Sequence, residues 1–365
     1  MSRHRMLALA APWVSCYGWA DAYSPSLCVT ILTLFGVICM NILTYYRSLV
    51  VFACFPCMNF LLTGPSAFAT EIARQSDMVV RVWPGEPPEW DTPEKAEQDI
   101  STEDSRTVAG HPVIRLSNVR DVELHVFPAT TESGKPSPVT VVICPGGAFN
   151  ILAWDLEGLE VAKRFQEAGV NAAALKYRVP SRKMEPKWQP AVQDIQRSIA
   201  MIRAGKVTPN VPAHVGVLGF SAGGNAAFHA ATAENRLYKA VDAADAEISP
   251  PDFAALIYPA WIVQDDRPDQ FREQIEITAE TPPMFLAHAE NDKHQVFNSV
   301  TVFQRLHAVG VPAALHVFTG SGHGFGARID GRADDLWPEL CVRWMRDSGW
   351  LLLNNSDSQA RTGDE

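Results

Sequence analysis

The segment VGVLGFSAGG at residues 215–224 restricts the fold of this 365-residue chain more than any other part of it. Its first half is a continuous apolar run of the kind that forms a strand buried on both faces. The run enters a G-x-S-x-G pattern at 219–223, and a stretch of small helix-forming residues follows. Only a very tight strand-to-helix turn presents a serine at such a point, and the glycines leave space for it. We therefore predict that Ser221 is a nucleophile at the N-terminus of a helix, where negative charge is stabilised.

Short apolar runs alternate with helical stretches through the rest of the body, which indicates an α/β protein with a mainly parallel, twisted sheet and helices on both faces. With 47% apolar and 20% charged residues the chain can bury a large core, and we expect one domain at 112–350. Two earlier runs, 113–116 and 122–127, predict an antiparallel hairpin at the sheet edge. The expected strands are 139–144, 170–177, 214–220, 253–258, 284–289 and 313–318, and the expected helices are 156–168, 190–204, 222–233, 294–309 and 334–347.

Residues 1–69 are predicted to be a hydrophobic targeting region. Arg47 precedes an apolar run at 49–62, and small residues follow at Ala67 and Ala69. This is the layout of a secretory signal peptide cleaved after Ala69, which predicts a secreted or periplasmic protein.

A retained membrane anchor is the alternative, because a second apolar stretch at 27–46 is nearly long enough to span a bilayer. The catalytic domain would then still lie outside the cytoplasm, and this segment would be the only route to membrane association. A true start at Met40 instead of Met1 would leave a single signal peptide at about 40–69.

Two polar segments flank the predicted domain. Residues 70–111 are expected to be an irregular lead-in, with Trp83 and Trp90 packed on the body. Residues 351–365 are expected to be a polar tail that is frayed from residue 354.

The charge and cysteine content exclude several classes of protein. With 31 basic and 41 acidic residues the net charge is −10, and no basic stripe is available to neutralise a nucleic acid. Five of the seven cysteines lie before residue 60, so the body has no disulfide framework. The C-x-x-C pattern at 54–57 lies in an apolar run without the strand-helix context of a redox motif. No cluster has metal-ligand spacing, and we expect no metal and no cofactor.

A serine hydroxyl is a weak nucleophile at neutral pH, so it needs a base and an acid that orients this base. His323 lies in the loop SGHGFG at 321–326, after the last expected strand, where it has no structural role in a helix or strand. The acid is expected just beyond the strand 284–289. We choose Asp292, because the chain there has room to turn back toward the histidine loop, and Glu290 is the alternative.

The expected strand at 139–144 ends in the glycine-rich loop PGGAF at 145–149. Backbone N–H groups in such a loop can bind the oxyanion of a tetrahedral intermediate, at roughly 3–4 kcal/mol per donor. The predicted donors are the amides of Gly147, Ala148 and Ala222. A plain strand-to-helix turn is the alternative interpretation of the loop.

From about residue 113 to residue 350 the chain resembles the α/β-hydrolase esterases related to acetyl xylan esterases and the hormone-sensitive-lipase-like enzymes. Besides the motifs above, WDLEG at 154–158, ALKYRVP at 174–180 and QDIQR at 193–197 are similar to that family's signatures. Pro145 and Ala148 depart from its H-G-G-G oxyanion loop. The resemblance implies an α/β-hydrolase fold and hydrolysis of an acyl ester, with a small acyl ester or an acetylated polysaccharide such as xylan as substrate.

Three further expectations concern substrate binding and helix pairing. The segment 261–281 is long enough for a small cap, and the absence of a large apolar insertion favours a small acyl group. Phe149 and Trp261 are predicted to line an acyl or sugar pocket, although both suit a core equally well. Asp194 and Arg197 are three residues apart and are expected to pair along one helix face.

Several other functions remain open. A prolyl-oligopeptidase-like peptidase shares the order serine, acid, histidine, but such enzymes usually carry a propeller domain and no blade repeats are visible. A non-catalytic binding module of the same fold normally lacks the serine or the histidine, and this chain has both. A glycosidase needs two carboxylates that flank the scissile bond, whereas these residues form an acyl-transfer set.

Overall fold

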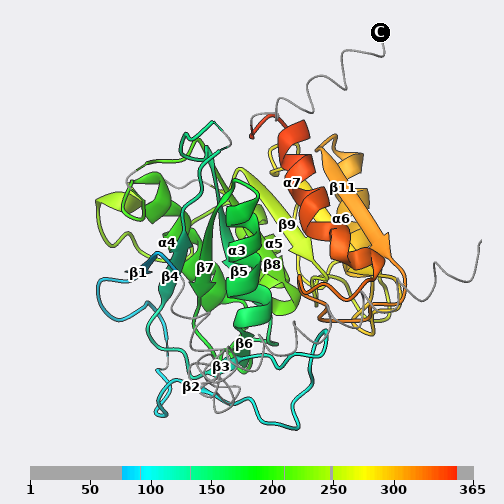
Figure 1. Cartoon of the computed structure of the whole chain (residues 1–365), viewed down its shortest axis with the longest axis horizontal. Coiled ribbons are helices and arrows are strands. Elements are labelled where there is room, and N and C mark those ends of the chain that lie inside the picture. The colour runs from blue at the N-terminus through cyan, green and yellow to red at the C-terminus, as the bar shows by residue number, and fades with distance from the viewer. Residues whose placement is uncertain (1–75, 91, 132, 209, 247–249, 352–365) are drawn as a thin grey trace, which may run out of the picture. The chain divides into compact units, whose positions relative to one another are not determined.

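A computed structural model describes residues 76–90, 92–131, 133–208, 210–246 and 250–351. Its central feature is an eight-stranded sheet in the order β1-β4-β7-β5-β8-β9-β10-β11 (Figure 1). The β1–β4 and β4–β7 pairs are antiparallel, and the five pairs from β7 to β11 are parallel. These strands are β1 (Met78–Arg81), β4 (Glu123–Phe127), β5 (Val139–Cys144), β7 (Asn171–Lys176), β8 (His214–Phe220), β9 (Phe253–Ile257), β10 (Met284–Ala289) and β11 (Ala313–Phe318).

The burial of the strands explains why the sequence pattern predicts their positions. Every residue of β5, β7, β9 and β10 is buried, as expected for parallel strands covered by helices on both faces. The predicted bounds of β5, β8, β10 and β11 agree with the structure to the residue. The predicted α/β class with a mainly parallel sheet is confirmed.

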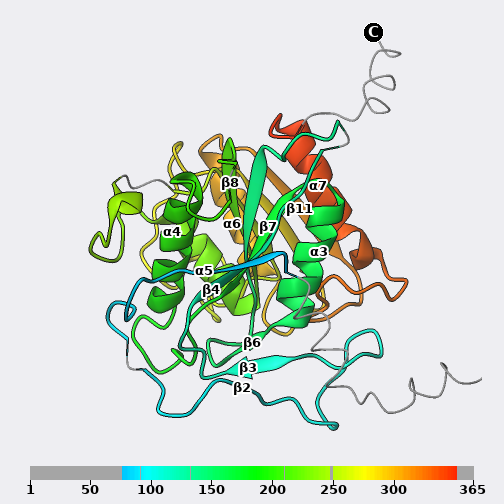
Figure 2. The same ribbon diagram turned by 60° about the vertical axis from the view of Figure 1, so that its left-hand side comes forward.

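Helices cover both sides of this sheet. α3 contacts α7, and both lie in front of the sheet in Figure 1, whereas α4 contacts α5. Figure 2 shows α3 and α4 on opposite sides of the strands. The predicted helix at 156–168 is divided into a π-helical turn and α3. The helical elements are η2 (Asp155–Leu159), α3 (Glu160–Glu167), α4 (Gln189–Arg203), α5 (Ser221–Thr232), η3 (Ala243–Asp245), α6 (Phe297–Ala308), η4 (Ala333–Leu336) and α7 (Trp337–Asp347).

The predicted N-terminal hairpin is wrong. β3 (Arg115–Ser117) pairs with β2 (Gln98–Asp99) and β6 (Ile151–Ala153) in a separate small sheet, whereas β4 joins the main sheet (Figure 2). The segment between β3 and β4 is anchored at Val119, which is fully buried and bridges to Val179. Alternating polarity located β4 to within one residue and β3 to within two, but it carries no information about which strand each one pairs with.

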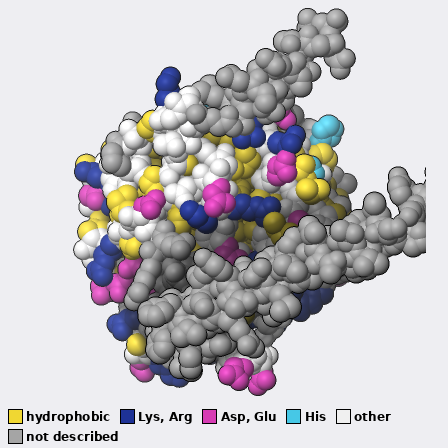
Figure 3. Space-filling model, viewed as in Figure 1, with side chains coloured by type: hydrophobic (Ala, Val, Ile, Leu, Met, Phe, Trp, Pro, Cys, Tyr) yellow, Lys and Arg dark blue, Asp and Glu magenta, His cyan; other side chains and the backbone are white. Residues whose placement is uncertain are grey.

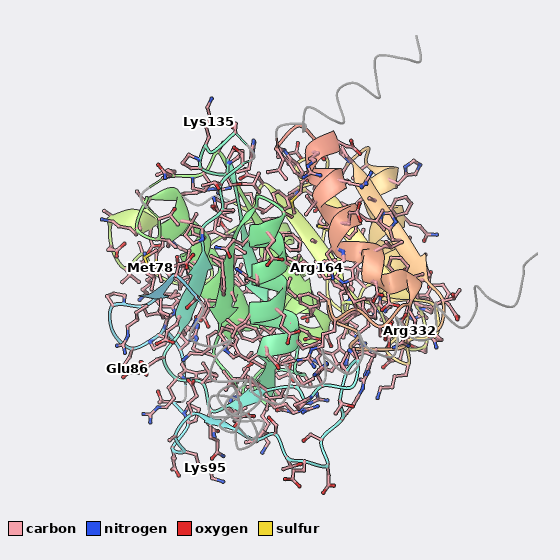
Figure 4. The ribbon with its side chains drawn as sticks, in the orientation of Figure 1. Met78, Glu86, Lys95, Lys135, Arg164 and Arg332 are labelled. Carbon is pink, nitrogen blue, oxygen red and sulfur yellow. The ribbon has the colours of Figure 1, made fainter. Side chains whose placement is uncertain are left out.

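The lead-in is less irregular than predicted. Its described part supplies β1, whose first residue Met78 is labelled in Figure 4, and the short strand β2. Trp83 is 3% exposed and belongs to the main core. Trp90 lies over the guanidinium of Arg178, with the ring centroid 5.6 Å from Cζ. Both tryptophans therefore pack on the body, as predicted.

The predicted pairing of Asp194 with Arg197 is also wrong. Asp194 pairs with Arg178 at 2.9 Å, and both side chains are fully buried. Arg197 instead pairs with Asp242 at 2.6 Å and with Asp245 at 2.9 Å. Both residues lie on buried positions of α4, where each side chain contacts a charged group from another element instead of its neighbour on the helix.

The predicted signal peptide at about 40–69, the apolar stretch 27–46, the C-x-x-C pattern and residues 352–365 of the tail lie outside the described residues. Where the structure is described, no helix has the length and apolarity needed to cross a bilayer. Nor do the described residues contain a cluster of side chains suited to a metal ion. On the face seen in Figure 3, acidic and basic side chains are interspersed.

Candidate active site

Ser221 is the first residue of α5, directly after β8, and its φ of +50° lies in the left-handed region. The two flanking glycines are sterically required. A Cβ at Gly219 would lie 2.2 Å from the carbonyl oxygen of Gly223, and a Cβ at Gly223 would lie 2.1 Å from that of Cys144. The close approach of strand, helix and neighbouring strand therefore forces the turn that the sequence pattern predicted.

The structure brings Ser221, His323 and Asp292 together at the carboxyl edge of the parallel strands. His323 Nε2 lies 2.8 Å from Ser221 Oγ, and His323 Nδ1 lies 2.6 Å from Asp292 Oδ2. This geometry fits an imidazole that donates its Nδ1–H to the carboxylate and accepts the serine hydroxyl proton at Nε2. The alternative acid, Glu290, is exposed, and no hydrogen bond joins its side chain to His323 in the described part of the chain.

A second histidine, which sequence reasoning missed, also binds Asp292. His288 Nε2 lies 3.0 Å from Asp292 Oδ2, and His288 Nδ1 lies 2.8 Å from Ser299 Oγ. Burial lowers the pKa of His288, so we assign a neutral ring that donates to the carboxylate and accepts from the serine. Although burial alone raises the pKa of Asp292, its hydrogen bonds to His288 and His323 hold it well below the usual range.

The loop that carries His323 is held from several sides. Gly322 N donates to Asn291 Oδ1 at 2.9 Å, and Arg106 Nη1 donates to the carbonyl oxygen of His323 at 2.9 Å. The ring of Tyr258 meets the His323 ring edge to face, with centroids 5.1 Å apart. Contacts from three separate parts of the chain thus fix the imidazole in place.

The chain that follows the histidine loop is tied to α3 and η2. Arg328 forms ion pairs with Asp155 at 2.9 Å and with Glu160 at 2.7 Å. Arg164, labelled in Figure 4, donates to the carbonyl oxygen of Ala327 at 2.7 Å. These buried and half-buried contacts anchor the loop to the body of the domain.

The predicted oxyanion loop lies against the serine. A Cβ at Gly146 would lie 2.9 Å from Ser221 Cβ. Gly147 and Ala148 have φ of +132° and +58°, and neither amide has an acceptor among the described residues. Ala222 is the second residue of α5, where helix N–H groups have no earlier carbonyl to bind. The three predicted donors are thus available to a ligand.

A buried carboxylate beneath this loop is the main feature that sequence reasoning missed. Gly146 N donates to Glu157 Oε2 at 2.7 Å, and the Tyr258 hydroxyl donates to Glu157 Oε1 at 2.8 Å. The same hydroxyl accepts from Gly326 N at 3.0 Å. Burial raises the pKa of Glu157. This network, which we call the Glu157 bridge, joins the oxyanion loop to the histidine loop.

The two aromatic residues predicted to line a pocket have different positions. Phe149 is fully buried in the core, and Trp261 stacks on it at a centroid distance of 6.0 Å. Ala260 N donates to the carbonyl oxygen of Ser221 at 3.1 Å, which places the half-buried Trp261 beside the serine. Of the two, only Trp261 is partly exposed next to the serine, and the prediction that it lines a pocket stays a prediction.

The segment 261–281, predicted as a small cap, contains no helix. Its middle is bound to α6, since Thr301 Oγ1 donates to the Pro268 carbonyl at 2.7 Å and Arg305 Nη2 donates to that of Asp269 at 2.8 Å. It is an irregular loop that begins beside the serine and continues along α6.

The sheet order, the strained serine turn and the placement of the histidine and acid loops define the α/β-hydrolase fold. Residues 191–337 match the family described as "Prolyl oligopeptidase family". The acetylxylan esterase of Xylanibacter ruminicola is 24% identical over 216 residues, which cover 52% of this chain and 42% of that protein. The chain thus matches less than half of the length of this curated relative.

Solved structures give the same fold. The acetyl ester-xyloside bifunctional hydrolase of Caldicellulosiruptor lactoaceticus is 24% identical, with a TM-score of 0.54 over 75% of this chain and 97% of that one. Esterase 2 of Thermogutta terrifontis, solved after phosphonylation by cyclosarin, is 21% identical, with a TM-score of 0.53 over 72% of this chain and 98% of that one. At such identities the likeness supports the fold.

Proposed function

We propose that this protein is a serine esterase that hydrolyses esters of small acyl groups, with acetate as the main acyl group. The observation that carries the proposal is the continuous relay from Ser221 Oγ through His323 to Asp292, with distances of 2.8 and 2.6 Å, on a strained turn beside unpaired amides. These are the parts that acyl transfer to a serine requires.

In the proposed mechanism His323 Nε2 takes the hydroxyl proton as Ser221 Oγ attacks the ester carbonyl. Asp292 holds the ring in the correct tautomer and stabilises the imidazolium that forms. The amides of Gly147, Ala148 and Ala222 bind the oxyanion. His323 then protonates the departing alcohol, which leaves an acyl-enzyme. A water molecule, deprotonated by His323, attacks this ester, and the acid leaves as the serine regains its proton.

We further propose that the acyl group is carried by a polysaccharide such as xylan and that the protein acts outside the cytoplasm. The similarity to an acetylxylan esterase supports the first point. The second is supported by the sequence pattern at about 40–69, which fits an export signal. N-terminal sequencing of the exported protein tests this location, with Thr70 as the expected first residue.

A peptidase is the second candidate, because the family match at 191–337 is to prolyl oligopeptidases. The two functions share the relay and differ in the leaving group, an alcohol or an amine. We prefer the esterase, because the curated relative that this chain matches is an acetylxylan esterase.

The decisive experiment compares leaving groups on the full chain. We would assay 4-nitrophenyl acetate, butyrate and octanoate, acetylated xylan, unsubstituted xylan and a prolyl 4-nitroanilide peptide, each with Ser221→Ala as the control. We expect acetate release from acetylated xylan, faster turnover of acetate than of octanoate, and labelling of Ser221 by a fluorophosphonate. Faster cleavage of the anilide than of any ester would establish the peptidase instead. Binding without any Ser221-dependent turnover would indicate a non-catalytic module.

A further inference from the structure

Two cationic side chains lie on the indole of Trp261, beside the proposed nucleophile. Lys187 Nζ lies 3.8 Å from the ring centroid, and Arg182 Cζ lies 5.1 Å from it. Both distances are within the range of a cation–π interaction. Since Ala260 binds the backbone of Ser221, the indole brings both positive charges to the edge of the active site.

The loop that carries these cations packs directly on the oxyanion loop. Ser181 N and Arg182 N donate to the carbonyl oxygen of Phe149 at 2.8 and 3.2 Å. Arg182 Nη1 lies 3.4 Å from the carbonyl oxygen of Ala148, one of the proposed oxyanion donors. On the histidine side, Arg106 binds the carbonyl oxygen of His323. Positive charge therefore borders the serine from two directions.

None of these three cations forms an ion pair with a carboxylate within the described ranges. By contrast, the buried Arg178 and Arg197 are both paired with aspartates. The acidic residues nearest to Lys187, Glu185 and Glu273, act on it only at longer range. Glu273 is already bound by the indole N–H of Trp188 at 2.8 Å.

Two like charges held on one ring repel each other, and Lys187 is partly buried whereas Arg182 is exposed. Burial, followed by the positive charge of Arg182, lowers the pKa of Lys187. An anion bound between the two cations would relieve this repulsion. Guanidinium and ammonium groups without a carboxylate partner are typical ligands of carboxylates and sulfates.

We infer that the substrate is an acyl ester whose alcohol part carries a negative charge close to the acylated hydroxyl, and that Arg182 and Lys187 bind this charge. The inference rests on the proposed esterase function and defines its substrate class. A uronic acid carboxylate and a sugar sulfate share the required chemistry. The acyl group is held at Ser221 while the anionic group of the carbohydrate lies over Trp261.

The test compares charged and neutral substrates of matched size. We would measure kcat/KM for an acetylated neutral xylo-oligosaccharide, for an acetylated oligosaccharide with a uronic acid next to the ester, and for one with a sulfate there. We expect at least a tenfold preference for a charged substrate, expressed in KM, which decreases in 0.5 M NaCl as screening predicts. The charged substrate with the larger kcat/KM relative to the neutral one identifies the anion as a carboxylate or a sulfate.

The variants are Arg182→Gln with Lys187→Gln, and Lys187→Met, which keeps the aliphatic packing on Trp261. We expect the ratio of charged to neutral kcat/KM to fall to about one in the double variant and to an intermediate value in Lys187→Met. A general loss of activity cancels in this ratio. Lys183→Gln is the matched control, since it removes one exposed charge from the same loop and should keep the wild-type ratio.

A wild-type ratio near one, or a preference that survives the double substitution, would overturn the inference. Such results leave the esterase proposal intact if Ser221-dependent turnover of 4-nitrophenyl acetate is present. If no ester is hydrolysed at all, the proposed function itself fails.

Discussion

Asp194 and Asp292 both have fully buried, hydrogen-bonded side chains, but Asp194 joins parts of the fold whereas Asp292 belongs to the proposed relay. Asp194 is bound by the Arg178 guanidinium at 2.9 Å and by the Trp83 indole at 2.7 Å. Asp292 is bound by the rings of His323 and His288. An arginine keeps its charge at all relevant pH values, whereas a histidine gains and loses a proton near neutrality.

The surroundings of the two carboxylates match this difference. Arg178 also donates to the carbonyl oxygens of Pro88 and Pro190, so the buried ion pair joins the lead-in to α4. The His323 side chain is 16% exposed and contacts Ser221. Burial alone therefore does not mark a functional carboxylate. What distinguishes Asp292 is a titratable partner that reaches solvent.

The largest effect is expected at the exposed end of the Asp292 relay. Ser221→Ala and His323→Ala should each lower kcat by about 10⁴- to 10⁶-fold, because the nucleophile and the base act as one unit. The free energy of unfolding should change by no more than about 1 kcal/mol, since neither side chain is part of the core. Ester kinetics and urea unfolding measure the two quantities. Activity retained in either variant would contradict the assignment.

Substitution of the two aspartates by asparagine separates the roles. Asp292→Asn should lower kcat by about 10⁴-fold, because the amide favours the wrong histidine tautomer. Asp194→Asn should leave kcat/KM of the folded protein unchanged and lower the free energy of unfolding by about 3–5 kcal/mol, because the Arg178 charge loses its buried partner. Asp292→Asn should destabilise less, since the imidazole partners of Asp292, unlike the Arg178 guanidinium, leave no permanent buried charge unpaired. If both variants lost mainly stability, the distinction between the two sites would be wrong.

The fold and the relay were predictable because each depends on local patterns. Buried parallel strands are short apolar runs, so β5 and β10 were predicted to the residue. The serine turn is specified by glycines that no other residue can replace. His323 and Asp292 follow from the order of loops at one sheet edge once Ser221 is placed.

The partners of buried polar groups were not predictable in the same way. A sequence pattern reports that a face is covered but not which element covers it. The partner of Asp194 is therefore Arg178, which lies on another segment, although Arg197 is closer in sequence. Glu157 and His288 were missed for the same reason, since their roles depend on Tyr258 and Asp292 meeting them in the folded chain.

The Glu157 bridge is expected to be a positioning device for the relay. Glu157→Gln removes one of two acceptors. Tyr258→Phe leaves Glu157 with only its bond from the Gly146 amide and leaves the Gly326 amide without its acceptor. Because small displacements of the oxyanion loop and the histidine loop weaken transition-state binding, each variant should lower kcat by about 10- to 100-fold with little change in KM. Glu167→Gln, at an exposed position of α3, is the control.

A purely structural role for the Glu157 bridge would give a different result. The free energy of unfolding would fall, while kcat of the remaining folded protein would stay at the wild-type value. Fluorophosphonate labelling rates add a second readout, because they report the orientation of Ser221 relative to the oxyanion donors. Labelling at the wild-type rate in both variants would contradict the positioning role.

The smallest effect concerns a buried histidine that has no acidic partner among the residues whose structure is described. His229 stacks on Trp188 at a centroid distance of 4.0 Å, and burial lowers its pKa from 6.5 to about 3. The unfolded chain binds a proton there below pH 6.5 and the folded chain does not, so this histidine stabilises the fold fully above pH 6.5. The contribution is lost as the pH falls toward 3, by about 1.4 kcal/mol per pH unit.

Urea unfolding of wild type and His229→Phe at pH 7 and pH 5 tests this linkage. Wild type should lose about 2 kcal/mol more than the variant between these two values, because phenylalanine keeps the stacking on Trp188 and cannot titrate. His288 provides the contrast, since its bond to Asp292 opposes the effect of burial on its pKa. If wild type and His229→Phe lost the same free energy of unfolding, a buried histidine without a carboxylate partner would tolerate acid as well as a buried histidine with one. The comparison drawn from Asp194 and Asp292 would then not extend to the histidines.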